Sequence, residues 1–189
     1  MNAFKKIGSV ISRPVEFFQE LISEGLGPAF GYFALILVIM ILLLIPVVLV
    51  GSLWIETPAW LLEYSQGELA VLIILGLVMI YLLKLVCSFI VAAIFHMWSL
   101  IWGGVGDYTD SYKALVYSFT PAAILVWILP LSLIWSLILL GISVAKLHDM
   151  SKTRATWMVI VTVILLGAAL YGAYWLWLTT GWFSSSTEA

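Results

Sequence analysis

Long apolar segments alternate with short polar ones along this chain. About 20 apolar residues are enough for a helix to cross a hydrocarbon core of ~30 Å, and a helix satisfies its own backbone groups there. The segments that meet this requirement are residues 30–53, 69–102, 110–129, 131–147 and 155–180. The pattern therefore predicts an all-α polytopic membrane protein with five transmembrane helices.

The same pattern divides the chain into three parts. Residues 1–28 form a polar, amphipathic N-terminal segment that is cytoplasmic or interfacial. Residues 29–183 contain the five spans, and residues 184–189 are a short polar tail on the external side. The chain thus consists of one membrane domain with short extensions.

A short helix is predicted within the N-terminal segment. Ser12 is placed to cap it, and Pro14 suits its first turn. Val15, Phe18 and Ile22 would share one side, opposite the polar residues. This amphipathic pattern is typical of a helix lying in the membrane interface, although a helix packed on the protein's own spans would show the same pattern.

Prolines and polar residues predict how the spans are shaped and joined. Pro46 is expected to kink the first span, and Pro130 marks a tight turn between the third and fourth. Between the first two spans, Thr57 and Pro58 predict the start of a short surface helix.

The second span is longer than a membrane requires. Residues 69–102 would form a helix of about 50 Å, so it must tilt, break near Gly76 or project beyond the bilayer. We expect tilt together with projection on the inner side.

The distribution of positive charge predicts the orientation. Outside the expected spans, or at their ends, positive residues all fall on one side: Lys5, Lys6, Arg13, Lys113, Lys146, Lys152 and Arg154. The other side carries glutamates without lysine or arginine, and tryptophans occur near both edges. The N-terminus is therefore expected in the cytoplasm and the C-terminus outside.

Composition narrows the class of function. Apolar residues make up 64% of the chain and charged residues 10%, whereas a soluble domain has about a quarter charged residues. The net charge of −2 gives no basic surface for nucleic acid. No nucleophile–base pair or cofactor motif is present, so we expect neither an enzyme nor a cofactor.

Lys84 is a candidate site residue because it lies inside the second span. A charge at mid-membrane is unfavourable by roughly 3 kcal/mol or more, and such residues are often functional. Lys84 could form a fixed site for an anion. Its long side chain could instead reach the interface without any binding role, which is the interpretation that we favour.

His96 is a second candidate, and two interpretations remain open. It could form a hydrogen bond across a helix interface, which the small residues on its side of the helix would permit. It could also join Asp107, Asp110, His148 and Asp149 in an inner-side polar or metal site. No spacing requires a metal, so we favour the hydrogen bond and predict no metal site.

A glycine turn and a proline mark the centre of the chain. Gly103, Gly104 and Gly106 predict a tight cytoplasmic turn, followed by Asp107 and Asp110. The third span contains Tyr117, Ser118 and Pro121. Pro121 leaves the carbonyl of Tyr117 without its helical donor, and nearby hydroxyls can satisfy it.

This central stretch resembles the core of the Yip family, the Ypt-interacting-protein group of membrane proteins. The features are a histidine, a Gly-Gly-x-Gly turn and a Tyr-Ser-x-x-Pro sequence. The matching positions are His96, Gly103, Gly104, Gly106, Tyr117, Ser118 and Pro121. The Arg13-Pro14 sequence resembles the entry segment of the family, and the likeness covers residues 12–178.

The resemblance implies five spans, a cytoplasmic N-terminus, an external C-terminus and no known catalytic activity. Eukaryotic relatives act in Golgi and endoplasmic-reticulum trafficking, bind Rab-type GTPases and usually carry a long cytosolic N-terminal region. With only residues 1–28 there, this chain is more similar to short prokaryotic members in the cell membrane. Lys84 is not part of the family pattern.

Two functions are carried forward as hypotheses. The first is a non-enzymatic scaffold or adaptor whose cytoplasmic face, residues 103–113 and 146–154, binds a protein or lipid-headgroup partner. The second is a channel or carrier for a small solute or anion that uses Lys84 and His96. The expected partners are the lipid bilayer, a protein at the cytoplasmic face and further copies of the chain, but no nucleic acid.

Overall fold

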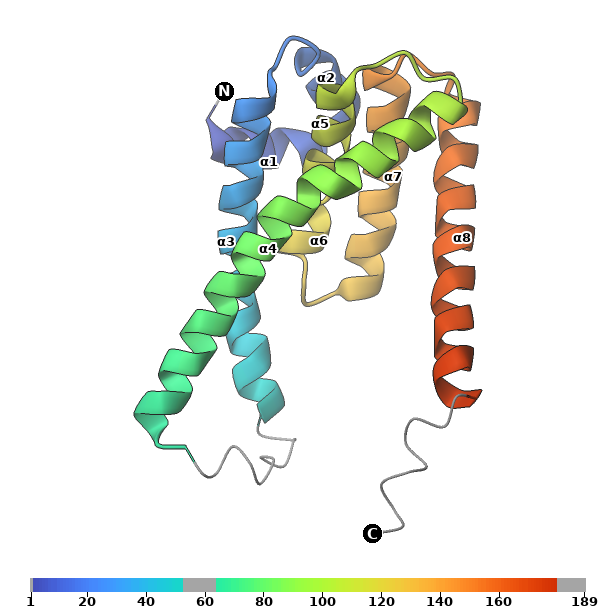
Figure 1. Ribbon diagram of the computed structural model, residues 1–189. Coiled ribbons are helices and arrows are strands. Elements are labelled where there is room, and N and C mark those ends of the chain that lie inside the picture. The colour runs from blue at the N-terminus through green and yellow to red at the C-terminus, as the bar shows by residue number, and fades with distance from the viewer. Residues whose placement is uncertain (1, 53–63, 180–189) are drawn as a thin grey trace.

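The computed structural model describes residues 2–52 and 64–179, and every regular element in these ranges is a helix. The helices are α1 (Ala3–Ser12), α2 (Pro14–Glu20), α3 (Leu26–Ser52), α4 (Gln66–Ile101), α5 (Tyr108–Ser118), α6 (Thr120–Ile124), α7 (Leu129–Leu147) and α8 (Lys152–Thr179). Figure 1 shows α1, α2 and the α4–α5 and α7–α8 connections at one end of the molecule, called the N-terminal end below. The all-α prediction is confirmed.

Four helical segments of the described ranges are long and apolar enough to cross a membrane: Leu26–Val47, Gly67–Ile101, Leu129–Leu147 and Lys152–Thr179. The remaining predicted span, residues 110–129, is divided between α5 and α6, with Phe119 between them. Five continuous spans are therefore not confirmed. The division lies next to Pro121, which cannot donate a helical hydrogen bond to Tyr117. As predicted, a nearby hydroxyl replaces that donor: Thr120 Oγ1 donates to the Tyr117 carbonyl at 2.7 Å.

α4 is one helix of 36 residues with no break at Gly76, or about 54 Å of helix. It begins with a capping box between Ser65 and Glu68. Figure 1 shows α4 running obliquely past α3 toward α8, and the tilt of this helix relative to a bilayer stays a prediction. Near α8, the indole Nε1 of Trp98 donates to Thr162 Oγ1 at 2.9 Å.

The two other prolines predicted to shape the spans lie in helices of the structure. Pro46 lies inside α3, which continues to Ser52. Pro130 is in the first turn of α7, and only residues 125–128 separate that helix from α6. The predicted surface helix at Thr57 and Pro58 and the tail 184–189 lie outside the described residues.

α5 is the centre of the core. It contacts α3, α4 and α7, and its buried residues lie on all sides of the helix: Ser111, Tyr112, Lys113, Ala114, Val116, Tyr117 and Ser118. A helix buried all round normally carries apolar residues. The hydroxyls and the ammonium of α5 therefore need partners inside the protein.

The N-terminal segment forms two helices rather than one, and its cap differs from the prediction. Ser12 Oγ donates to the carbonyl of Gly8, while Arg13 occupies the N-cap position of α2 without a side-chain bond. Ser12 is the last residue of α1, and its hydroxyl therefore bonds within that helix. The prediction that Ser12 caps the following helix was therefore wrong, although Pro14 does lie in the first turn of α2.

α2 packs on α7, which supports the alternative of a helix held on the protein's own spans. Phe17 and Phe18 are buried, whereas Val15 and Ile22 are exposed. The ring of Phe17 meets that of Tyr117 edge-on, with centroids 5.2 Å apart. An interfacial location for the exposed side of this segment remains a prediction.

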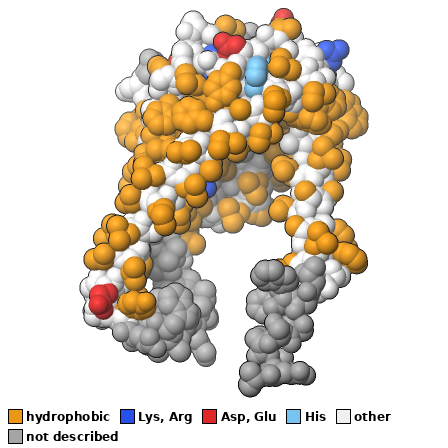
Figure 2. Space-filling model, in the orientation of Figure 1, with side chains coloured by type: hydrophobic (Ala, Val, Ile, Leu, Met, Phe, Trp, Pro, Cys, Tyr) orange, Lys and Arg blue, Asp and Glu red, His pale blue; other side chains and the backbone are white. Residues whose placement is uncertain are grey.

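Hydrophobic side chains cover much of the visible surface along α4 and α8, as Figure 2 shows. Most of the visible charged and histidine side chains gather at the N-terminal end. An apolar belt below a polar end is the surface expected of a protein that crosses a bilayer.

Candidate functional site

The glycine turn begins where α4 ends. Gly103 has φ +80°, a left-handed conformation that glycine adopts without steric strain. The amide of Gly103 donates to the carbonyl of Leu100, and that of Gly104 to the carbonyl of Ser99. These bonds satisfy the last carbonyls of the helix and turn the chain away from it.

Gly104 and Gly106 are needed for a different reason, which the sequence pattern did not reveal. A Cβ on Gly104 would lie 3.1 Å from Cβ of His148, and one on Gly106 would lie 2.6 Å from Nδ1 of the same residue. Val105 N donates to the carbonyl of His148 at 3.1 Å. The two glycines therefore let the turn approach the end of α7.

His96 and His148 are joined by serines. His96 Nδ1 lies 3.0 Å from Ser111 Oγ, which lies 3.1 Å from His148 Nε2. On the other side of the ring, His148 Nδ1 lies 3.5 Å from Ser99 Oγ, and Ser99 donates to the carbonyl of His96. We call these four residues the histidine–serine cluster.

One proton arrangement satisfies all of these contacts. His96 Nδ1 donates to Ser111, and Ser111 donates to His148 Nε2. His148 Nδ1 then donates to Ser99, whose own proton goes to the His96 carbonyl. The imidazole of His148 is neutral in this arrangement, because one ring nitrogen donates and the other accepts. It agrees with the pKa of His148, which burial lowers most strongly; nearby His96 and Lys113 lower it further, against the opposing effect of Asp110 and Asp107.

Two of the three acidic metal candidates cap a helix. Asp107 and Asp110 form the capping box of α5, in which each carboxylate accepts from the backbone amide of the other. Asp149 is exposed and has φ +49°. Among residues 2–52 and 64–179, no group of three or more histidine, cysteine or acidic side chains is placed to hold a metal ion.

A second polar cluster joins the N-terminal segment to α5, and sequence reasoning missed it. Lys6 Nζ pairs with the carboxylate of Glu24 and donates to the hydroxyl of Tyr117 at 2.8 Å. The Tyr117 hydroxyl donates to the same carboxylate. We call these residues the lysine–tyrosine cluster. The sequence pattern indicates only that Lys6 is one of the positive charges expected on the cytoplasmic side.

Lys113 belongs to this region too. Its side chain is 1% exposed, and Nζ pairs with Asp110 at 2.8 Å. Nζ also donates to the carbonyls of Leu21 and Glu24, at 2.8 and 3.0 Å. Because Lys113 and Tyr117 are four residues apart on α5, they lie on one side of the helix. That spacing was the signal available in the sequence.

The remaining candidates lie apart from these clusters. Ser118 Oγ is 3.2 Å from Ser143 Oγ, which links α5 to α7, and Pro121 is buried in the first turn of α6. Lys84 is exposed on α4, and within the described ranges no hydrogen bond or ion pair is found for it.

A comparison with models of known protein families gives one match. The family model described as the Yip1 domain matches residues 8–178. No curated protein and no solved structure matched the chain. The matched range includes the glycine turn, the histidine–serine cluster and all but the last residue of the four candidate spans. Of the lysine–tyrosine cluster it includes Glu24 and Tyr117, whereas Lys6 lies before it.

Proposed function

This chain belongs to the Yip1 domain family, and from that premise we propose that it is a non-enzymatic membrane scaffold or adaptor. Its partner surface is formed by residues 103–113 and 146–154, at the N-terminal end. The proposal places this end in the cytoplasm, in accordance with the positive charges of the sequence. The partner is a protein, and assembly with further copies of the chain is compatible with this role.

The observation that carries the proposal is the composition of this surface. Val105 at the tip of the glycine turn is 77% exposed, and Ile101 just before it is 75% exposed. Asp107, Lys152 and Arg154 are exposed in the same two segments. Exposed aliphatic side chains bordered by charges of both signs are typical of a protein-binding site.

The clusters beneath the surface hold it in place. His148 links the two segments because its carbonyl accepts from Val105 and its ring bonds to Ser111 of α5. A partner would therefore meet a preorganised surface, which reduces the entropy lost on binding. In this proposal the histidine–serine cluster is a support and does not itself contact the partner.

A photo-crosslinking residue at Val105, in native membranes, tests the proposal. We expect one discrete protein adduct, identifiable by mass spectrometry and weakened by Ile101→Asp. The matched control is the same residue at Met79, which is 70% exposed on α4. The proposal is wrong if Val105 yields only lipid adducts or the same adducts as position 79.

The second hypothesis, a channel or carrier, has less support. It requires a water-filled path to Lys84. The two cavities described here are a groove between α7 and α8 and a shallow depression of about 380 Å³ near Glu68, and neither is lined by Lys84 or His96. In proteoliposomes we expect the same leak-level anion flux for the wild type and Lys84→Ala. A flux that depends on Lys84 would favour the carrier.

A further inference from the structure

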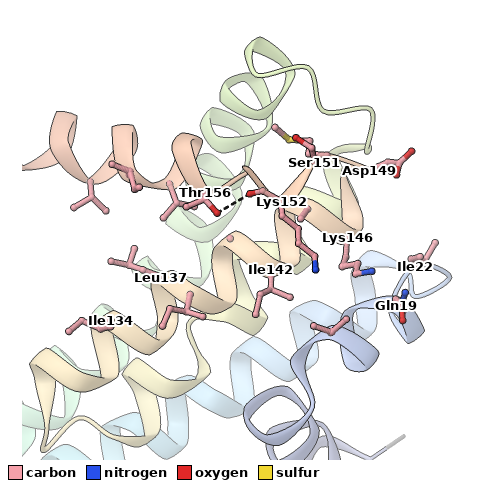
Figure 3. Close-up of a pocket in the computed structure, with 18 of the residues that line it drawn as sticks. Gln19, Ile22, Ile134, Leu137, Ile142, Lys146, Asp149, Ser151, Lys152 and Thr156 are labelled. Atoms are coloured by element: carbon pink, nitrogen blue, oxygen red, sulfur yellow. Dashed lines mark hydrogen bonds between the residues drawn. The ribbon is translucent and has the colours of Figure 1, made fainter. Parts of the chain in front are cut away.

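A long groove lies between α7 and α8, at the N-terminal end. Its volume is about 1020 Å³, and its walls are mostly aliphatic. The aliphatic walls include Ile134, Ile138 and Ile142 from α7 and Ile160, Val163 and Ile164 from α8. Figure 3 shows the groove opening between these two helices, with Gln19 and Ile22 of the N-terminal segment at one end.

Two lysines line the same end of the groove. Lys146 belongs to the last turn of α7, and Lys152 begins α8. In Figure 3 the Lys152 ammonium points between the two helices and the Lys146 ammonium points toward Gln19 at the same end, whereas Asp149 points away from them. Within the described part of the chain, no ion pair is found for either lysine, so both charges are available to an anion.

The groove has an open wall at Gly141. A Cβ at this glycine would meet no atom within 4 Å, so packing against a neighbouring helix does not require the glycine. Its absent side chain leaves room beside Ile138 and Ile142. A large residue introduced there would project into open space, which provides a way to fill the groove without disturbing the core.

The dimensions and chemistry favour one class of occupant. Lys146 and Ile134 are twelve residues apart on α7, which is about 18 Å along the helix. One leaflet of a bilayer has a hydrocarbon thickness of roughly 15 Å, half of the usual core. Basic pockets between transmembrane helices bind anionic lipid headgroups. A free phosphate would gain nothing from the aliphatic walls.

We propose that this groove binds one anionic phospholipid. Its phosphate lies between Lys146 and Lys152, and an acyl chain follows the aliphatic walls of α7 and α8. The lipid would fill the open side of the α7–α8 pair and neutralise Lys146 and Lys152, two lysines of the partner surface. Lipid binding does not depend on the adaptor role. Lipid retention can be absent while Val105 still crosslinks to a protein, and the reverse is equally possible.

Native mass spectrometry of the purified full chain tests the proposal, with phosphatidylglycerol and phosphatidylcholine added in turn. We expect one phosphatidylglycerol to be retained in preference to phosphatidylcholine. Lys146→Gln and Lys152→Gln should each weaken retention about fivefold. Lys5→Gln, which removes an exposed charge from α1, should leave it unchanged.

Gly141→Phe provides a second test that keeps both lysines. It should reduce retention by filling the groove, while helical circular dichroism and elution volume stay those of the wild type. Equal retention of the two lipids, or unchanged retention in both lysine variants and Gly141→Phe, would overturn the proposal. Displacement of the lipid by millimolar inorganic phosphate would also overturn it, because the site would then be one for a small anion.

Discussion

Single atoms decide the shape of the glycine turn. At Gly106 a Cβ would lie 2.6 Å from His148 Nδ1 and 2.7 Å from the carbonyl oxygen of Leu147. Both atoms are held in place, the first by the histidine–serine cluster and the second by the end of α7. The glycine is therefore required by its neighbours, not by its own backbone angles.

We expect Gly106→Ala to destabilise the protein by about 1–3 kcal/mol, the usual effect of forcing an extra carbon into a packed site. Gly167→Ala is the matched control, because a Cβ at Gly167 meets no atom within 4 Å. It should be neutral or slightly stabilising, since alanine favours a helix. Thermal unfolding in detergent measures both, and equal midpoints would contradict the close approach to His148.

His148 should make stability depend on pH. Burial lowers its pKa in the folded protein, whereas an unfolded histidine titrates near about 6.5. Below that pH the unfolded state binds more protons, so stability falls as the pH decreases toward the folded pKa. We expect the thermal unfolding midpoint to decrease when the pH is lowered from about 7.5 to about 5.5.

The comparison variant is His148→Gln, which cannot titrate in this range. It should be less stable than the wild type at the higher pH, but its midpoint should change less with pH. If both proteins show the same dependence, other groups are responsible for it.

At the scale of elements, α5 joins α4, α7 and the N-terminal segment. Its residues bond to α4 through Ser111, to α7 through Ser118 and to the N-terminal segment through Tyr117. A transmembrane interface gains little from apolar contact, because lipid is equally apolar. Polar bonds to a buried helix can therefore decide which helices associate.

The lysine–tyrosine cluster should hold the N-terminal segment in place. In Glu24→Gln, the ammonium of Lys6, whose side chain is 7% exposed, would lose its carboxylate. Removing one partner of a buried ion pair lowers the free energy of unfolding by about 3–5 kcal/mol. We expect a decrease near the lower end of this range, because the Tyr117 hydroxyl remains as a partner of Lys6. Chemical denaturation in detergent measures this loss.

The matched control is Glu16→Gln. Glu16 pairs with Arg13 at 3.7 Å, with side chains 65% and 68% exposed, and such pairs contribute about 0–1 kcal/mol. Equal decreases in the free energy of unfolding of the two variants would mean that the Lys6–Glu24 pair does not hold the N-terminal segment in place.

For the molecule as a whole, the contact between the glycine turn and His148 constrains the topology. Residues 103–106 and 148–154 lie at one end, and the far ends of α3, α4 and α8 lie at the other (Figure 1). α5–α6 and α7 together leave and return to the N-terminal end. We therefore expect the two connections to lie on one side of the membrane, whether or not α5–α6 crosses it completely.

Cysteine labelling tests this arrangement. In a Cys87→Ser background, single cysteines at Val105 and Thr153 should react with a membrane-impermeant maleimide from the cytoplasmic side. A cysteine at Tyr64, which is 44% exposed at the other end of α4, should react from the outside. Labelling of positions 105 and 153 from opposite sides would contradict the fold and the partner surface together.

The amino-acid sequence by itself determined the membrane class, four of the helices and the places where the chain turns. It could do so because a bilayer demands about 20 apolar residues per span, and because Gly103 and Pro121 act through their own backbones. Only the tertiary structure decided that α5 and α6 are separate helices buried at the centre. It also decided the partners of the polar residues: Tyr117 and Glu24 are 93 positions apart, and Ser111 and His148 are 37 apart. Bonds over such separations depend on how the helices pack, and no local pattern of residues encodes that.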